Sequence, residues 1–72
     1  MEQIREKKVT SVRRGRYLVE VPIEVTYSPE APDEPILSPD TARLLDEVGR
    51  RAATGDVAWL KQHGKVYELV EA

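Results

Sequence analysis

The sequence contains no cysteine, no phenylalanine and only one tryptophan. Without cysteine it can form no disulfide, no thiolate metal site and no cysteine nucleophile. The absence of cysteine fits a reducing compartment, and we expect a cytoplasmic protein. Apolar runs are only a few residues long, whereas a helix that crosses a membrane needs about 20 consecutive apolar residues. Residues 1–8 also lack the apolar segment of a secretory signal peptide.

The chain has 72 residues, which is enough for one domain with one small core. Apolar residues make up 40% of it and charged residues 33%, as expected for a soluble globular domain rather than a disordered chain. A chain of this length buries only about 60% of its unfolded surface, so its stability margin is thin. We predict a single domain over residues 1–72, with a proline-rich acidic loop at residues 28–39.

The most regular pattern lies in residues 17–27, where each odd position is apolar or aromatic and the even positions are mostly polar. Side chains alternate between the two faces of a strand, so this pattern predicts a long strand with one buried face. Glu20 and Glu24 fall on its exposed face. Pro22 has no N–H for a ladder, so its position must face solvent, a sheet edge or a bulge.

Weaker signals place the neighbouring segments. Residues 3–12 are predicted to form a second strand, of which residues 7–12 pair with the long strand after a turn at residues 13–16. The loop at residues 28–39 contains four of the five prolines and is predicted to be stiff, extended and acidic. Ile36 and Leu37 are its only large apolar residues, and we expect them to pack against the body of the domain.

A helix is predicted to begin after Ser38, which can cap it, and to end at Gly55, which tolerates a left-handed backbone. Helical spacing gives one apolar stripe, formed by Leu44, Leu45, Val48 and Ala52. Two acid–base pairs lie four residues apart on the other side: Asp46 with Arg50, and Glu47 with Arg51.

The segment at residues 56–63 can be read as a short helix capped by Asp56 or as a strand, and we favour the helix. Residues 65–71 are predicted to form a last strand beside the long one. The fold class is therefore α+β. We expect a small antiparallel sheet of about three strands in the order β-β-α-α-β, with one long and one short helix packed on one face.

Charge is distributed unevenly along the chain. Residues 1–16 contain six bases and two acids, a net charge of +4, whereas residues 17–72 contain five bases and eleven acids, a net charge of −6. Such a basic segment can be a solvated surface, or it can bind an anionic partner or a second copy of the chain. One alternative function is therefore nucleic-acid binding, in which Tyr17 stacks on a nucleobase. The phosphates would then be bound by five basic residues of the hairpin: Lys7, Lys8, Arg13, Arg14 and Arg16.

Chemistry-bearing residues are sparse. His63 is the only histidine, and the nearest acid in the sequence, Glu68, lies in a predicted strand, so His63 lacks the partners that a metal site needs. Glu20 and Glu24 would be about 13 Å apart along a strand, too far for the carboxylate pair of a glycosidase. We therefore predict no catalytic residues, no metal site and no cofactor.

A non-catalytic protein-binding module is the preferred interpretation. Trp59 and Tyr67 are candidates for a partner surface, together with Glu20 and Glu24, although the two aromatic residues are also candidates for the core. The amphipathic strand and helix offer more apolar surface than the other elements can cover. We therefore expect a homodimer.

Two segments resemble known families. Residues 52–64, Ala-Ala-Thr-Gly-Asp-Val-Ala-Trp-Leu-Lys-Gln-His-Gly, resemble the helix-turn-helix of an ankyrin repeat, which implies two helices. Leu-Leu-Asp-Glu-Val at residues 44–48 and Gly-Lys-Val-Tyr-Glu-Leu-Val at residues 64–70 are similar to antitoxins of the prevent-host-death type. Those antitoxins are small dimers that bind DNA, so this resemblance implies a small dimeric regulator. Here a long strand and a proline-rich loop precede the helix.

Overall fold

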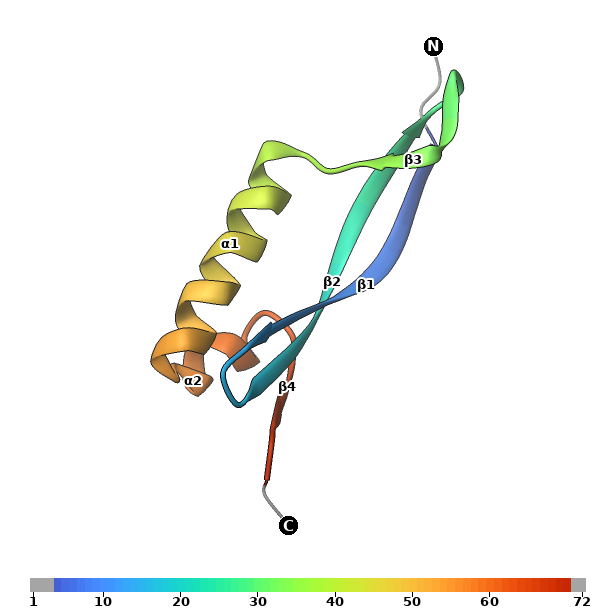
Figure 1. Cartoon of the computed structure of the whole chain (residues 1–72). Helices are drawn as coiled ribbons and strands as arrows, with labels where there is room; N and C mark the ends of the chain where they lie inside the picture. The colour runs from blue at the N-terminus through green and yellow to red at the C-terminus, as the bar shows by residue number, and fades with distance from the viewer. Residues whose placement is uncertain (1–3, 71–72) are drawn as a thin grey trace.

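The computed structural model describes residues 4–70 and has six elements, shown in Figure 1. In chain order they are β1 (Ile4–Arg14), β2 (Tyr17–Ser28), β3 (Ala31–Ile36), α1 (Pro39–Thr54), α2 (Val57–Lys61) and β4 (Lys65–Glu68). The strands form one antiparallel sheet, and both helices lie on the same side of the β1–β2 hairpin (Figure 1). The predicted α+β class is confirmed, with one strand more than the predicted order contains.

The hairpin is longer than predicted, because β1 pairs with β2 along its whole length, from Ile4 opposite Tyr27 to Arg14 opposite Tyr17. Its loop contains only two residues, Gly15 and Arg16. Gly15 has a φ of 58°, and glycine in the first position of a two-residue loop is typical of a type II′ turn. This turn fixes the register of the hairpin.

Strand β2 lies at the centre of the sheet. β1 covers one of its edges, whereas β4 pairs with Tyr17–Glu20 and β3 with Thr26–Ser28 on the other. Between these two short strands, no strand in the described part of the chain pairs with residues 21–25 on that edge. Hydrogen-bonded and non-bonded pairs alternate along a hairpin, so Pro22, opposite Val9, points its nitrogen into this gap. The prediction allowed solvent, a sheet edge or a bulge at Pro22, and the unpaired gap beside β2 agrees with it.

The prediction that residues 28–39 form only a loop is wrong in part, because residues 31–36 form β3. Its pairing with β2 is short and has a register shift next to Ser28. Proline is tolerated in such a strand at the sheet edge. Ile36 and Leu37 are 48% and 41% exposed, so the rest of the domain covers only about half of each residue.

Helix α1 has the predicted ends. The Ser38 hydroxyl accepts a hydrogen bond from the Thr41 N–H at 3.1 Å, and Gly55 has a left-handed φ of 74°. Both predicted pairs are present, with Arg50 3.0 Å from Asp46 and Arg51 2.7 Å from Glu47. Val48 and Ala52 are buried on the inner side of the helix, as the apolar stripe predicts.

The segment after Asp56 forms a helix, α2, which is the alternative favoured by the sequence over a strand. The Asp56 carboxylate caps it by accepting a hydrogen bond from the Trp59 N–H at 3.3 Å. Gly64 lies tightly against β2, because a Cβ at this position would lie 2.3 Å from the backbone oxygen of Glu20. Only glycine therefore allows β4 to approach β2 this closely.

The core occupies the end of the molecule near the hairpin turn. Its main cluster of buried side chains is Val19, Val21, Val48, Ala52 and Leu60, and Val25 and Tyr27 are buried farther along β2. The far end of the hairpin extends beyond the helices (Figure 1), and the molecule measures 49 × 24 × 16 Å. Its radius of gyration is 14.3 Å, whereas a compact chain of this length has one of about 11 Å. The molecule is therefore elongated, with a small core at one end.

Replacement of Gly64 tests the close approach of β4 to β2. We expect Gly64→Ala to lower the free energy of unfolding by about 1–3 kcal/mol, because the added methyl group overlaps a backbone oxygen. Urea denaturation measures the change.

Gly49→Ala is the matched control, because the three atoms nearest its Cβ would all belong to the flexible Arg14 side chain, the first at 3.4 Å. Alanine favours the helix over glycine by up to about 1 kcal/mol, so this variant should be as stable as the original or more stable. Equal stability of Gly64→Ala and the original chain would contradict the prediction.

Candidate interaction surface

The sheet has one face covered by helices and one uncovered face, which we call the outer face. Register and alternation place on it the odd residues of β1 from Arg5 to Arg13, the even residues of β2 from Leu18 to Thr26, and Lys65 and Tyr67 of β4. The odd residues of β2, which include Val19 and Val21, lie on the opposite face and pack against the helices. The outer face is thus the broad surface of the sheet that no described element covers.

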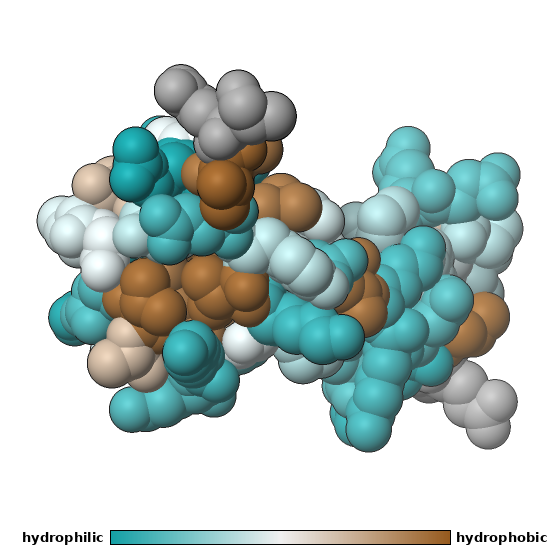
Figure 2. Space-filling model, turned by 90° about the horizontal axis from the view of Figure 1, so that it is seen from below, coloured by the Kyte–Doolittle hydropathy of each residue, from teal (hydrophilic) through white to brown (hydrophobic). Residues whose placement is uncertain are grey.

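Apolar side chains on the outer face occur in neighbouring pairs. Tyr67 lies opposite Leu18, and Val9 lies opposite Pro22. Val9 is 65% exposed and Tyr67 44% exposed. Leu69 follows the same strand and is also exposed, with its N–H bonded to the Arg16 carbonyl at 2.6 Å. Seen from below, the surface of the molecule shows several separate brown areas divided by hydrophilic surface (Figure 2).

The structure brings together three of the four predicted partner-binding residues. Tyr67, Glu20 and Glu24 share the outer face, where Glu20 lies between Ser11 and Lys65 in the sheet and Glu24 lies opposite Lys7. This face therefore alternates apolar pairs with pairs of opposite charge.

Trp59 lies elsewhere, on α2 on the helical side of the sheet. It is half-buried and packs against the core. Its ring centroid is 4.1 Å from that of His63, and the Arg51 guanidinium carbon is 5.1 Å from the ring centroid. The structure therefore favours the core interpretation of Trp59 and separates it from Tyr67.

Sequence reasoning missed Val9, Leu18 and Leu69 as members of this surface. The signal for Leu18 was present, since it is the one large apolar residue among the even positions of the long strand. Val9 could be assigned to the outer face only once the hairpin register was known. Leu69 belongs to it because alternation continues from Tyr67 past the end of β4.

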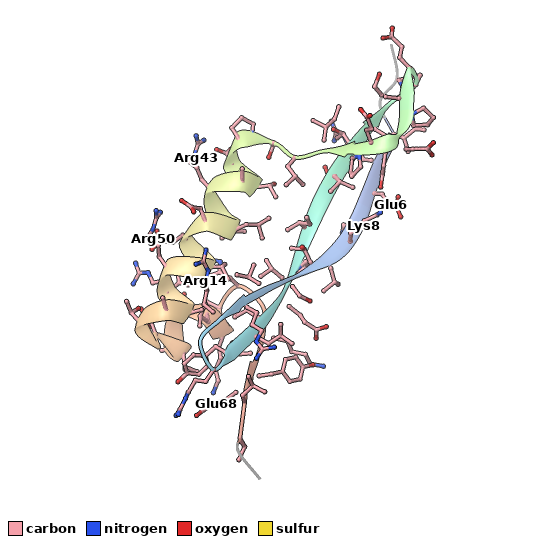
Figure 3. All side chains as sticks on the ribbon, viewed as in Figure 1. Glu6, Lys8, Arg14, Arg43, Arg50 and Glu68 are labelled. Atoms are coloured by element: carbon pink, nitrogen blue, oxygen red, sulfur yellow. The ribbon has the colours of Figure 1, made fainter. Side chains whose placement is uncertain are left out.

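The five bases of the nucleic-acid alternative do not form one patch. Lys7 and Arg13 lie on the outer face, whereas Lys8 and Arg14 lie on the opposite face. The Arg14 side chain lies over Gly49 of α1, and Arg16 pairs with Glu68 at 3.6 Å. Figure 3 shows Arg14 beside the helix, well apart from Lys8. Alternation along β1 therefore divides the cluster.

Two aromatic residues near these bases face inward. Tyr17, predicted to be free to stack on a base, is half-buried against the core. Tyr27 is buried, and the Lys8 ammonium lies 5.6 Å from its ring centroid. A hydrogen bond to Tyr27 raises the pKa of Lys8. Among the described residues of β1 and β2, no exposed aromatic side chain lies beside these basic residues to stack on a nucleobase.

A network centred on Arg51 joins the two helices. Arg51 donates one hydrogen bond to Glu47 at 2.7 Å and one to Asp56 at 2.8 Å. Because Asp56 also caps α2, the network fixes the angle at which α2 leaves α1. Hydrogen bonds from Arg50 and Arg51 hold the pKa of Glu47 below its ordinary value of 4.5.

His63 is half-buried beside Trp59, and the residues from 4 to 70 contain no group of three or more side chains that could hold a metal ion. Within the same range, no helix is long and apolar enough to cross a membrane. No model of a known protein family matches the chain, nor does any curated protein or solved structure.

Glu47→Gln tests the helix network through its pH dependence. A carboxylate whose pKa is lowered in the folded state stabilises the fold above its ordinary pKa, and this contribution is lost as the pH falls through the folded value. We expect Glu47→Gln to lower the melting temperature at pH 7, and the difference from the original chain to shrink as the pH falls below the ordinary pKa of a glutamate.

Thermal unfolding followed by circular dichroism gives the melting temperature at each pH. Glu30→Gln, which removes an exposed charge beside β3, serves as the control and should change the melting temperature little at either pH. A deficit of the Glu47→Gln variant that stays constant from pH 7 to low pH would contradict the network.

Proposed function

We propose that this chain is a non-catalytic, cytoplasmic protein-binding module that works as a homodimer, with the outer face as the interface between two copies. The observation that carries the proposal is the amount of surface that the single chain leaves in solvent. The cytoplasmic location follows the expectation from the sequence.

The accessible surface of the chain is 5525 Å², whereas a compact monomer of this mass exposes about 4,500 Å². The excess is about 1,000 Å². A stable protein–protein interface of standard size buries about 800 Å² on each partner. One interface on an otherwise ordinary surface would therefore account for the excess.

The outer face has the composition that a two-fold interface needs. It presents an exposed tyrosine and several aliphatic side chains, and aromatic residues are enriched where interfaces bury them. Its charges have both signs, since Lys7 and Lys65 lie among Glu20 and Glu24. In a two-fold interface the same patch meets itself, so a face with both signs can pair its bases with the acids of the second copy.

Light scattering at about 50 mM and about 500 mM salt tests the proposal, because high salt screens surface charge and leaves apolar burial in place. We expect the mass of a dimer at both salt concentrations. We also expect Tyr67→Asp to give a monomer, because it places an unpaired charge in the interface.

Ile4→Asp is the matched control. Ile4 is 55% exposed, similar to Tyr67 at 44%, but it lies opposite Tyr27 on the other face of the sheet. This variant should remain a dimer. A monomer at both salt concentrations for the original chain would overturn the homodimer, as would a dimer that persists in Tyr67→Asp.

A further inference from the structure

Strand β1 forms a long, unpaired edge of the sheet. It pairs with β2 on one side, and no other strand within residues 4–70 pairs with it. Arg14 and Tyr17 close a two-residue turn, so the even residues of β1 bond to β2 and the odd residues point their N–H and C=O groups outward. From Arg5 to Arg13, this edge offers hydrogen bonds to an added strand.

The charge of β1 argues against a second copy as that strand. β1 contains five bases and one acid, a net charge of +4. A symmetric antiparallel pair centred on Val9 would place Arg5 of each copy opposite Arg13 of the other. Like charges directly opposite each other across two strands are destabilising. The edge therefore disfavours pairing with itself.

We propose that the β1 edge binds an extended acidic segment of another protein, which adds to the sheet as a further antiparallel strand. Backbone hydrogen bonds would supply affinity, and the side chains opposite Arg5, Lys7 and Arg13 would supply selectivity. The hairpin already contains such a pair of opposite charges, because Glu24 of β2 lies opposite Lys7 across the β1–β2 ladder. The incoming strand would carry acids opposite those three bases and an apolar residue opposite Val9.

The positions of the bases favour a strand over a nucleic acid. Arg5, Lys7 and Arg13 lie on one face of β1, two or more residues apart, at the spacing of side chains on a paired strand. Arg14 lies over α1 and Arg16 pairs with Glu68, so neither joins them in a compact phosphate site. The added strand would bond to the backbone groups of the lateral edge, and its side chains would lie beside the outer-face side chains of β1.

The test uses the full chain, labelled with nitrogen-15, and a synthetic peptide, acetyl-Glu-Thr-Thr-Thr-Val-Thr-Glu-Thr-Glu-amide, designed to run antiparallel to β1. We expect slowed amide hydrogen exchange on binding at the odd residues from Arg5 to Arg13. The even residues already bond to β2 and should change little. The peptide with lysine in place of its three glutamates should not bind. Exchange that slows at odd and even residues alike, or not at all, would overturn the proposal.

Val9→Pro separates strand addition from attraction by charge alone. Its N–H points outward, so proline leaves the β1–β2 ladder intact and removes one bond to the added strand. We expect this variant to stay folded and to bind the glutamate peptide about tenfold more weakly. Val9→Thr, which keeps the N–H, should bind as the original chain does. Unchanged binding by a folded Val9→Pro variant would overturn strand addition.

Charge reversal provides a second variant that does not rely on proline. Lys7→Glu combined with Arg13→Glu should lose the glutamate peptide and bind the lysine peptide. Single-stranded DNA of about 20 nucleotides is the competing probe. If DNA displaces the glutamate peptide and binds equally well to Val9→Pro, the edge is a nucleic-acid site and the proposal fails.

Discussion

Val19 and Val21 of β2 pack against Val48, Ala52 and Leu60 of the two helices, and this contact holds the two layers of the molecule together. It depends on the alternation of side chains along β2, which turns one row of apolar residues toward the helices and one mixed row toward solvent. A shift of one residue in the register would exchange the two rows. The two-residue turn at Gly15 prevents that shift, so the turn and the core specify the same arrangement.

The same row explains why the core stays at one end. α1 and α2 reach only the half of β2 that follows the turn, and β4 is held there by the close approach of Gly64 to Glu20. The other half pairs only with the short β3, and there Val25 and Tyr27 are buried whereas Ile36 and Leu37 are largely exposed. A chain of 72 residues thus maintains a strand of twelve residues at the cost of a large surface.

Local signals were sufficient for the elements that carry them. Alternation identified β2, and caps at Ser38, Gly55 and Asp56 identified both helices. β1 was underestimated because only Thr10 and Val12 of this edge strand are even partly buried, so its apolar residues show no regular alternation. β3 was missed because its prolines argue against a strand and its pairing with β2 depends on contacts that are distant in sequence. Three predicted site residues share the outer face. Trp59 does not, because it lies on α2, where its side chain packs against the core.

Alternation also decides what the basic segment can do. Adjacent bases such as Lys7 and Lys8, or Arg13 and Arg14, look like a cluster in the sequence, but neighbours on a strand point to opposite faces. The strand therefore divides a run of charge into two sparse rows, one on the helix side of the sheet and one on the outer face. The bases of the outer row repel an identical strand, whereas the backbone groups of every second residue remain free to bond. Together these two properties favour an acidic strand as the partner. The charge that protects β1 from aggregation is then also the feature that determines which segment can bind it.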